Sequence, residues 1–287
     1  MEIFKLNIKI LADSLNTATG DRLTTFLLPK FVKQLLAQLN THRVLSRNAA
    51  SSRSIPIKKV IDQIMIDPHI PLWTRNQRGM VGIDDLTRDE RKKATLEWLQ
   101  ARDEAIVKAK KLDEQGIAKQ HINRLLEPWL TVPVIVSATD WNNFFNLRTK
   151  DDVQPDFRDT SREMFTLYNQ STPKQLRVNE WHLPFINWHT SVDLKSALKI
   201  STARCARVSY LNHYGLIDLE ADYSLHDRLL EDAHASPLEH SARALPKSTP
   251  CRNFKGWMQY RVHVEENISL VEGVSLKADD QPLLCRD

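Results

Sequence analysis

The residues best suited to chemistry in this chain are concentrated in residues 41–53. This segment contains three arginines, one histidine, three serines and one asparagine, and no acidic residue. A guanidinium group matches a phosphate through paired hydrogen bonds, and hydroxyl and imidazole groups add short-range donors. Because no carboxylate in the segment competes for the arginines, its composition is that of an anion-binding loop. On composition alone, a solvated polar loop is an equally good interpretation.

The order of residues within this arginine-rich loop favours binding. Residues 42–53 read H-R-x-x-S-x-N-x-x-S-x-R. This pattern resembles the signature R-H-R-x-x-S-x-N-E-x-S-x-R of the flavin-dependent thymidylate synthases, in which the loop holds FAD and dUMP together. Such a motif is a hypothesis that its surroundings must support.

Further segments are similar to the same family. Residues 200–210 and 234–240 resemble its A-A-R-V-S-[YF] and H-x-[ST]-P-[FL]-E-H elements, and residues 116–156 resemble its G-[IV], A-R-x-x-L-P and N-F-L-x-L-R elements. The first two elements normally precede the arginine-rich loop, but here they follow it. We therefore expect a family-like chain in rotated order, as if circularly permuted. Such a rearrangement is physically cheap where the termini of a domain lie close together at its surface.

The resemblance implies which residues bind and activate the nucleotide. Arg148 matches an arginine at the pyrimidine edge, where a fixed cation beside an acidic N–H favours ionisation at N3. Arg148 and Ser51 are therefore the catalytic candidates. Without the resemblance, Arg124 would be interpreted as a surface arginine of a helix. The residues implied to bind dUMP are Gln38, Ser51, Arg53, Arg124 and Arg148.

The resemblance also implies FAD as the cofactor. Nucleotide phosphate and flavin diphosphate must be held near each other, which requires several cations and backbone amides. Some of the matching residues surround the start of the helix that carries Arg148, where free amides suit a phosphate or a ring carbonyl. The residues expected to contact FAD are His42, Arg43, Asn48, Ser137, Ala138, Thr139, Asn143, His234 and Ser236.

Two positions depart from the family signature. Thr41 stands where the family has the first arginine of R-H-R, and Ala49 stands where it has a glutamate. Thr41 cannot neutralise phosphate charge, and Ala49 removes an acceptor near the flavin and the nucleotide. The rotated order brings Arg261 towards the arginine-rich loop, so Arg261 is a candidate for a compensating cation. A surface position at the end of an amphipathic helix is an equally good interpretation of Arg261.

The resemblance implies reductive methylation of dUMP to dTMP, with methylenetetrahydrofolate as carbon donor and NADPH as reductant. The cofactors carry the difficult steps of such chemistry. None of Cys205, Cys251 and Cys285 lies in a recognisable nucleophile context, so a covalent thiolate route has no obvious agent. One alternative is a deoxyuridylate hydroxymethylase, in which water traps the folate methylene. Another is a non-catalytic homologue that binds a nucleotide or nucleic acid.

Composition and partners set further expectations. The chain has 41% hydrophobic and 26% charged residues and a net charge of +4, which is typical of a soluble globular protein. No apolar run approaches the roughly 20 residues that span a bilayer, and Lys5 and Lys9 interrupt the N-terminal apolar residues, so a cytoplasmic enzyme is expected. His234 and His240 lack a clear third ligand, which argues against a metal site. The family implies a homotetramer with shared active sites, and nucleic acid is an unlikely partner.

We expect an α/β fold, with an antiparallel or mixed sheet flanked by helices, to position these residues. The chain is expected to form a single domain, residues 1–287, in which residues 263–287 are a loose tail. Alternation over residues 4–11, a turn at 16–21 and the apolar run 23–28 predict a hairpin. Pro29 is expected to open a helix that delivers the arginine-rich loop. Capping-box spacing at 87–90 predicts a long helix that Gly116 ends. The segment around Cys205 is apolar and strand-like.

Overall fold

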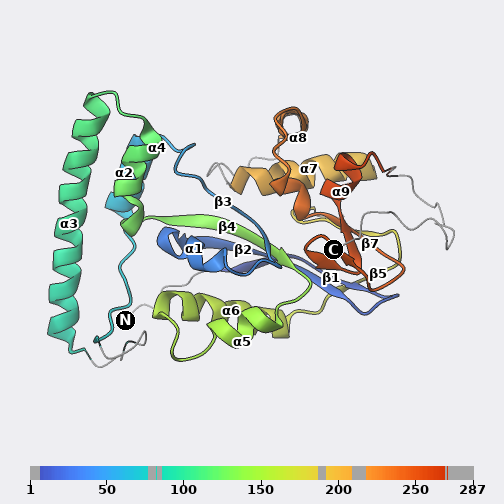
Figure 1. The fold of residues 1–287 in the computed structure, drawn as a ribbon, viewed down its shortest axis with the longest axis horizontal. Coiled ribbons are helices and arrows are strands. Elements are labelled where there is room, and N and C mark those ends of the chain that lie inside the picture. The colour runs from blue at the N-terminus through green and yellow to red at the C-terminus, as the bar shows by residue number, and fades with distance from the viewer. Residues whose placement is uncertain are drawn as a thin grey trace.

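A five-stranded mixed sheet forms the centre of the structure (Figure 1). The computed structural model describes residues 7–76, 82, 86–186, 192–208, 218–268 and 270. The strand order is β3-β4-β2-β1-β5, and only β1 and β5 pair in parallel. The strands are β1 (Lys9–Asn16), β2 (Arg22–Val32), β3 (Ser46–Ala49), β4 (Thr131–Ala138) and β5 (Lys174–Leu176). The predicted sheet class is therefore confirmed.

β1 and β2 form the predicted hairpin, and Gly20 adopts a positive φ of 76° in the turn between them. The helix expected to start at Pro29 is wrong, because β2 runs through this residue to Val32. Pairing of β2 with β4 is irregular between Leu28 and Phe31, so Pro29 lies where no ladder hydrogen bond is required of it. Helical structure starts only at η1 (Lys33–Leu35), followed by α1 (Leu36–Leu39).

Helices cover both faces of this sheet (Figure 1). On one face lie α5 (Asn142–Arg148) and α6 (Pro155–Gln170), and Phe31 packs edge-to-face on Phe157 with ring centroids 5.6 Å apart. On the other face, Leu27 of the sheet packs in one cluster with Cys205 of α7 (Leu194–Arg207). Residues 200–207 are therefore helical, and the strand-like interpretation is wrong. Eight residues of α7 are buried, and a buried helix lacks the periodicity that would distinguish it from a strand.

The long helix α3 (Arg88–Glu114) was predicted from local signals and is confirmed. Thr87 and Glu90 form the capping box, and Gly116 with φ 74° follows the helix end. α3 stands at one end of the molecule beside α2 (Ile57–Ile66) (Figure 1). The chain returns to the sheet through α4 (Lys119–Ile122), η2 (Asn123–Leu125) and η3 (Glu127–Trp129).

The C-terminal part adds a smaller sheet of order β10-β7-β6. Its elements are β6 (Trp181–His182), α8 (Leu219–Glu231), η5 (Ser236–Glu239), β7 (Ala242–Ala244), β8 (Pro250–Cys251), β9 (Phe254–Lys255), β10 (Trp257–Gln259) and α9 (Tyr260–Glu265). The tail boundary expected at residue 263 falls inside α9, and His263 is buried. Residues 271–287, like residues 4–6 of the predicted first strand, lie outside the described residues.

A chain of five buried polar side chains connects the two sheets. Ser14 Oγ lies 2.9 Å from His182 Nδ1, and His182 Nε2 lies 2.8 Å from Thr25 Oγ1. Thr25 Oγ1 is 2.6 Å from Ser137 Oγ, which is 2.8 Å from His240 Nδ1. Burial lowers the pKa of His182 and that of His240 to about 3. Both imidazoles are therefore neutral at physiological pH.

This chain predicts loss of stability in acid. An unfolded histidine titrates near pH 6.5, so from there down to about pH 3 the unfolded state takes up protons that the folded state excludes. The free energy of unfolding should therefore fall with falling pH, by up to about 1.4 kcal/mol per pH unit for each histidine. Denaturant unfolding at about pH 7 and pH 5 should show a shallower decline in His182→Gln than in the wild type. Equal declines in both proteins would contradict the prediction.

Candidate active site

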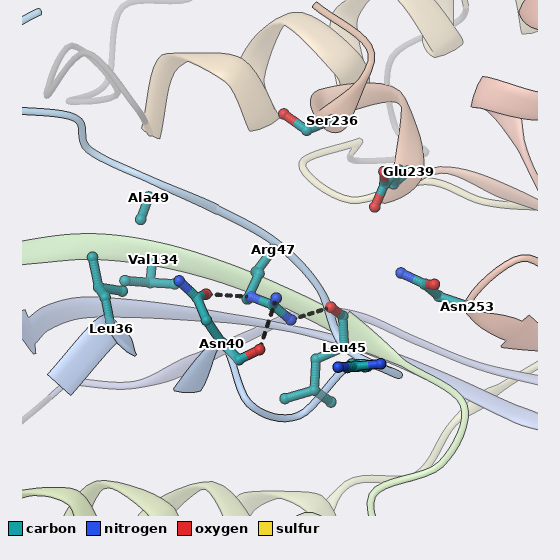
Figure 2. A pocket seen from close by; sticks show the side chains of 10 residues that line it. Leu36, Asn40, Leu45, Arg47, Ala49, Val134, Ser236, Glu239 and Asn253 are labelled. Carbon is teal, nitrogen blue, oxygen red and sulfur yellow. Dashed lines mark hydrogen bonds between the residues drawn. The ribbon is translucent and has the colours of Figure 1, made fainter. Parts of the chain in front are cut away.

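A cleft of about 560 Å³ lies between the arginine-rich loop and the segment 234–240. In Figure 2, Ala49 and Arg47 lie on one side of it and Ser236 and Glu239 on the other. Segments distant in the sequence therefore form its two walls. The lining residues are Leu36, Asn40, Arg43, Leu45, Arg47, Ala49, Val134, Ser236, Glu239 and Asn253.

The position of the first wall is fixed by β3. This strand is hydrogen-bonded to β4, with Ser46 opposite Ser137. The buried Ser46 Oγ also accepts hydrogen bonds from Asn253 Nδ2 at 3.1 Å and from Gln259 Nε2 at 2.9 Å. The C-terminal segment 250–259 is thus docked directly on the arginine-rich loop and contributes Asn253 to the cleft.

Arg47 holds the loop in shape. Its Nε donates to Asn40 Oδ1 at 2.6 Å, and its Nη1 donates to the Leu45 carbonyl at 2.6 Å (Figure 2). Nη1 also donates to the His42 carbonyl at 3.0 Å. The sequence pattern did not single out Arg47, because a guanidinium used by its own loop has no spacing signature. Arg43, in contrast, is exposed and has no side-chain hydrogen bond within the described part of the chain. Arg43, unlike Arg47, is therefore free to meet a ligand.

Arg148 approaches the same loop from α5. Its Nε donates to His42 Nε2 at 2.9 Å, and its Nη2 donates to Thr41 Oγ1 at 3.4 Å. Its guanidinium also lies over the ring of Phe157, 4.9 Å from the centroid. Burial lowers the pKa of His42, and the charges of Arg148 and Arg47 lower it further, so the imidazole is neutral and can accept. An arginine at position 41 would place a second cation beside Arg148.

Three of the other residues expected to bind dUMP, Ser51, Arg53 and Arg124, lie at or beside the end of the loop that follows β3, whereas Gln38 lies before the loop. Ser51 Oγ accepts from the backbone N–H of Arg53 at 3.3 Å, and the Arg53 side chain is exposed. Asn123 fixes this part of the loop through hydrogen bonds to two of its carbonyls, and its neighbour Arg124 is exposed. Gln38 precedes the loop, and its carbonyl accepts from Thr41 Oγ1. These four residues are not among those lining the cleft.

The residues expected to contact FAD lie in different environments. Arg43 and Ser236 line the cleft, whereas Ser137 and Ala138 are fully buried in the sheet. Asn143 and His234 are exposed, Asn48 and His42 are buried, and Thr139 Oγ1 accepts from the backbone N–H of Lys255 at 3.0 Å. The cleft therefore brings together two of these residues, and flavin contacts by the others stay predictions.

Arg261, the candidate for a compensating cation, is connected to the cleft through Glu239. Its Nη1 donates to Glu239 Oε1 at 2.7 Å, and its Nε donates to Glu265 Oε1 at 2.7 Å. Glu239 lines the cleft, while Arg261 does not. The guanidinium thus neutralises an acidic wall residue, and direct contact of Arg261 with a ligand stays a prediction.

The described residues offer neither a metal site with three ligands nor an accessible thiol. No cluster of three or more metal-ligating His, Cys, Asp or Glu side chains occurs among the described residues. Cys205 and Cys251 are fully buried, and burial raises the pKa of the Cys205 thiol, which disfavours a thiolate. Cys285 lies outside the described residues. Nor does any described helix combine the length and apolar character needed to cross a membrane.

Comparison with known proteins identifies a family. The family model described as thymidylate synthase complementing protein matches residues 23–174, more than half of the 287-residue chain. This range includes the arginine-rich loop and Arg148, and it ends before the segments 200–210 and 234–240. No curated protein matches the sequence.

Solved structures with weak overall similarity were also found. A UMP/dUMP methylase, PolB from Streptomyces cacaoi bound with 5-Br UMP, has 14% identity and a TM-score of 0.45 over 57% of this chain and 88% of that one. The same methylase bound with 5-Br dUMP has 17% identity and a TM-score of 0.38 over 52% and 66%. The flavin-dependent thymidylate synthase ThyX from Helicobacter pylori, complexed with FAD and dUMP, has 17% identity and a TM-score of 0.34 over 50% and 67%.

The two cleft arginines should respond differently to removal. Arg47→Ala leaves loop carbonyls without their donor and should lower the free energy of unfolding by about 1–3 kcal/mol. Arg43→Ala removes an exposed side chain from the same loop and should change it by less than about 0.5 kcal/mol. Denaturant unfolding of both variants checks this, and equal losses would show that Arg47 does not hold the loop.

Proposed function

The chain belongs to the thymidylate synthase complementing protein family and is a methyltransferase of that family, and on this premise we propose that it methylates dUMP at C5 with FAD as cofactor. Methylenetetrahydrofolate is the proposed carbon donor and NADPH the proposed reductant. The observation that carries the proposal is the cleft in which Arg43 of the arginine-rich loop faces Ser236 of the segment 234–240. Both segments were assigned to the flavin from the sequence alone.

The residues of the cleft fit a flavin nucleotide. Arg43 offers a free guanidinium, and the amides of Asn40 and Asn253 and the hydroxyl of Ser236 add neutral hydrogen-bonding groups. A diphosphate is best held by such charge-assisted bonds. Glu239 on the opposite wall can accept from an N–H or hydroxyl of the cofactor. When bound, FAD supplies the hydride transfer that no side chain of this protein can perform.

Arg148 is the residue proposed to activate the pyrimidine. Bonds to His42 and Thr41 fix the direction of its guanidinium, and its Nη1 has no hydrogen-bond partner among the described residues. A preorganised cation at the ring edge stabilises the negative charge that develops when N3 ionises. Because His42 is neutral, it orients Arg148 without adding charge of its own.

Arg53 and Arg124 are proposed to bind the nucleotide phosphate, with Ser51 beside Arg53 in the loop and Gln38 just before it. Arg53 follows β3 in the chain, whereas Arg148 contacts His42, which precedes β3. The resemblance to the family supports an active site shared between subunits, in which the phosphate-binding group of one protomer would join the cleft of another. A homotetramer remains the proposed assembly.

Product analysis tests the proposed function. Purified protein should be yellow, and dTMP should form from dUMP only when methylenetetrahydrofolate and NADPH are added to the flavin-loaded protein. Omission of each component in turn is the control. A hydroxymethylated product would instead indicate the hydroxymethylase. A colourless protein that binds oligonucleotides and converts no dUMP would overturn the proposal.

Single substitutions test the roles of the arginines. Arg148→Ala should lower turnover at saturating dUMP by about 100- to 1,000-fold, the usual effect of losing one preorganised charge-stabilising group. Arg53→Ala should mainly raise the KM for dUMP, by about 10- to 100-fold. The control is Arg162→Ala, because within the described residues the exposed Arg162 side chain bonds only to Asp151 and the Thr149 carbonyl. If steady-state kinetics show that Arg148→Ala turns over saturating dUMP as fast as the wild type, Arg148 has no part in the mechanism.

A further inference from the structure

Ser137 connects the two walls of the cleft. On β4 it pairs with Ser46 of β3, which belongs to the arginine-rich wall. Its hydroxyl lies 2.8 Å from Nδ1 of His240, which directly follows Glu239 of the opposite wall. Ser137 is itself fully buried and does not line the cleft. It is therefore placed to act on a ligand only through the residues that it holds.

If every hydroxyl proton is used within the buried chain, its hydrogen bonds run in one direction. A neutral imidazole has one N–H and one lone pair, and each hydroxyl donates once. If Ser14 donates to His182, then His182 donates to Thr25, Thr25 donates to Ser137, and Ser137 donates to Nδ1 of His240. His240 then carries its proton on Nε2. If the chain runs the other way, His240 donates to Ser137 through Nδ1, and its Nε2 is a lone pair. In either case the chain fixes one tautomer of His240.

His240 is held almost entirely by this chain. Its imidazole is fully buried, and its Nε2 has no hydrogen-bond partner within the described residues. The bond from Nδ1 to Ser137 is thus the polar anchor of this side chain. Loss of one member of a buried network leaves the remaining polar groups unsatisfied, which favours movement of the segment that carries them. That segment is η5, which supplies Ser236 and Glu239 to the cleft.

We propose that Ser137 and His240 are positioning residues that hold the segment 234–240 against the arginine-rich loop and thereby set the affinity of the cleft for flavin. Ser137 was expected to touch FAD directly, and in this assignment it acts through His240 instead. The effect on flavin rests on the proposed function. The anchoring of one wall to the other rests only on the contacts of this chain.

Hydrogen exchange of the protein without added ligand tests the anchoring. In Ser137→Ala, backbone amides of residues 236–241 should exchange about tenfold faster than in the wild type, because the residue that directly follows η5 has lost its buried bond to the central sheet. The matched control is Ser161→Ala. Ser161 is equally buried, but its hydroxyl bonds to the Phe157 carbonyl within α6. Unchanged exchange in Ser137→Ala, or the same increase in Ser161→Ala, would overturn the proposal.

Titration with FAD tests the consequence. Ser137→Ala should bind FAD about tenfold more weakly, with turnover at saturating FAD within about twofold of wild type. Ser137→Thr, which restores a hydroxyl on the strand, should recover the affinity, and Ser161→Ala should leave it unchanged. If Ser137→Ala does not fold, Ser137→Cys weakens the same bond with little change of side-chain shape, because a thiol is a weak donor and acceptor, and smaller changes in the same directions are expected of it.

The outcomes separate the two proposals. If the wild type binds no flavin, the proposed function fails, and hydrogen exchange alone decides whether Ser137 anchors η5. If the wild type binds FAD but Ser137→Ala binds it equally well, the proposed function stands and the positioning role is refuted.

Discussion

The candidate site depends on the antiparallel pairing of β3 with β4. This pairing turns the arginine-rich loop, which has few apolar side chains of its own, into an edge strand of the central sheet. β4 then leads into α5, which brings Arg148 back to His42 at the start of the same loop. The pairing also sets Ser137 opposite Ser46, from where it reaches His240. One strand pair therefore fixes the positions of three groups, which are the loop cations, Arg148 and the second wall of the cleft.

The electrostatics of the site suit anions because its cations have few acidic partners. Arg47 is bonded to carbonyls and an amide, and Arg148 is bonded to a neutral imidazole and a hydroxyl. Glu239 is the acidic residue among those lining the cleft, and Arg261 already pairs with it. These contacts give a physical reason for a threonine at position 41. It accepts from Arg148, where an arginine would repel that residue, so the difference from the family signature changes the charge beside Arg148.

Local signals in the sequence were sufficient for some elements and not for others. The capping box at Thr87 and the turn after β1 depend on neighbouring residues, and both were predicted correctly. Pro29 was misassigned because its fit in β2 depends on irregular pairing with β4, which lies some hundred residues away. The arginine-rich loop was recognisable from composition and spacing. The buried chain through Ser14 and His182 has no spacing signal, because its members come from separate strands and meet only in the folded state.

The meeting of the loop with the segment 234–240 also bears on the rotated order, which stays a prediction. What the cleft requires is contact between its walls, and the bond from Ser137 to His240 meets this requirement whichever segment comes first in the chain. The order of the segments does change the entropic cost of bringing the two walls together. Gln259 and Asn253 reach Ser46 across more than 200 residues of sequence, so these links can form only after most of the chain is synthesised. β4 is synthesised earlier, so it is available to the arginine-rich loop before the segments that complete the facing wall.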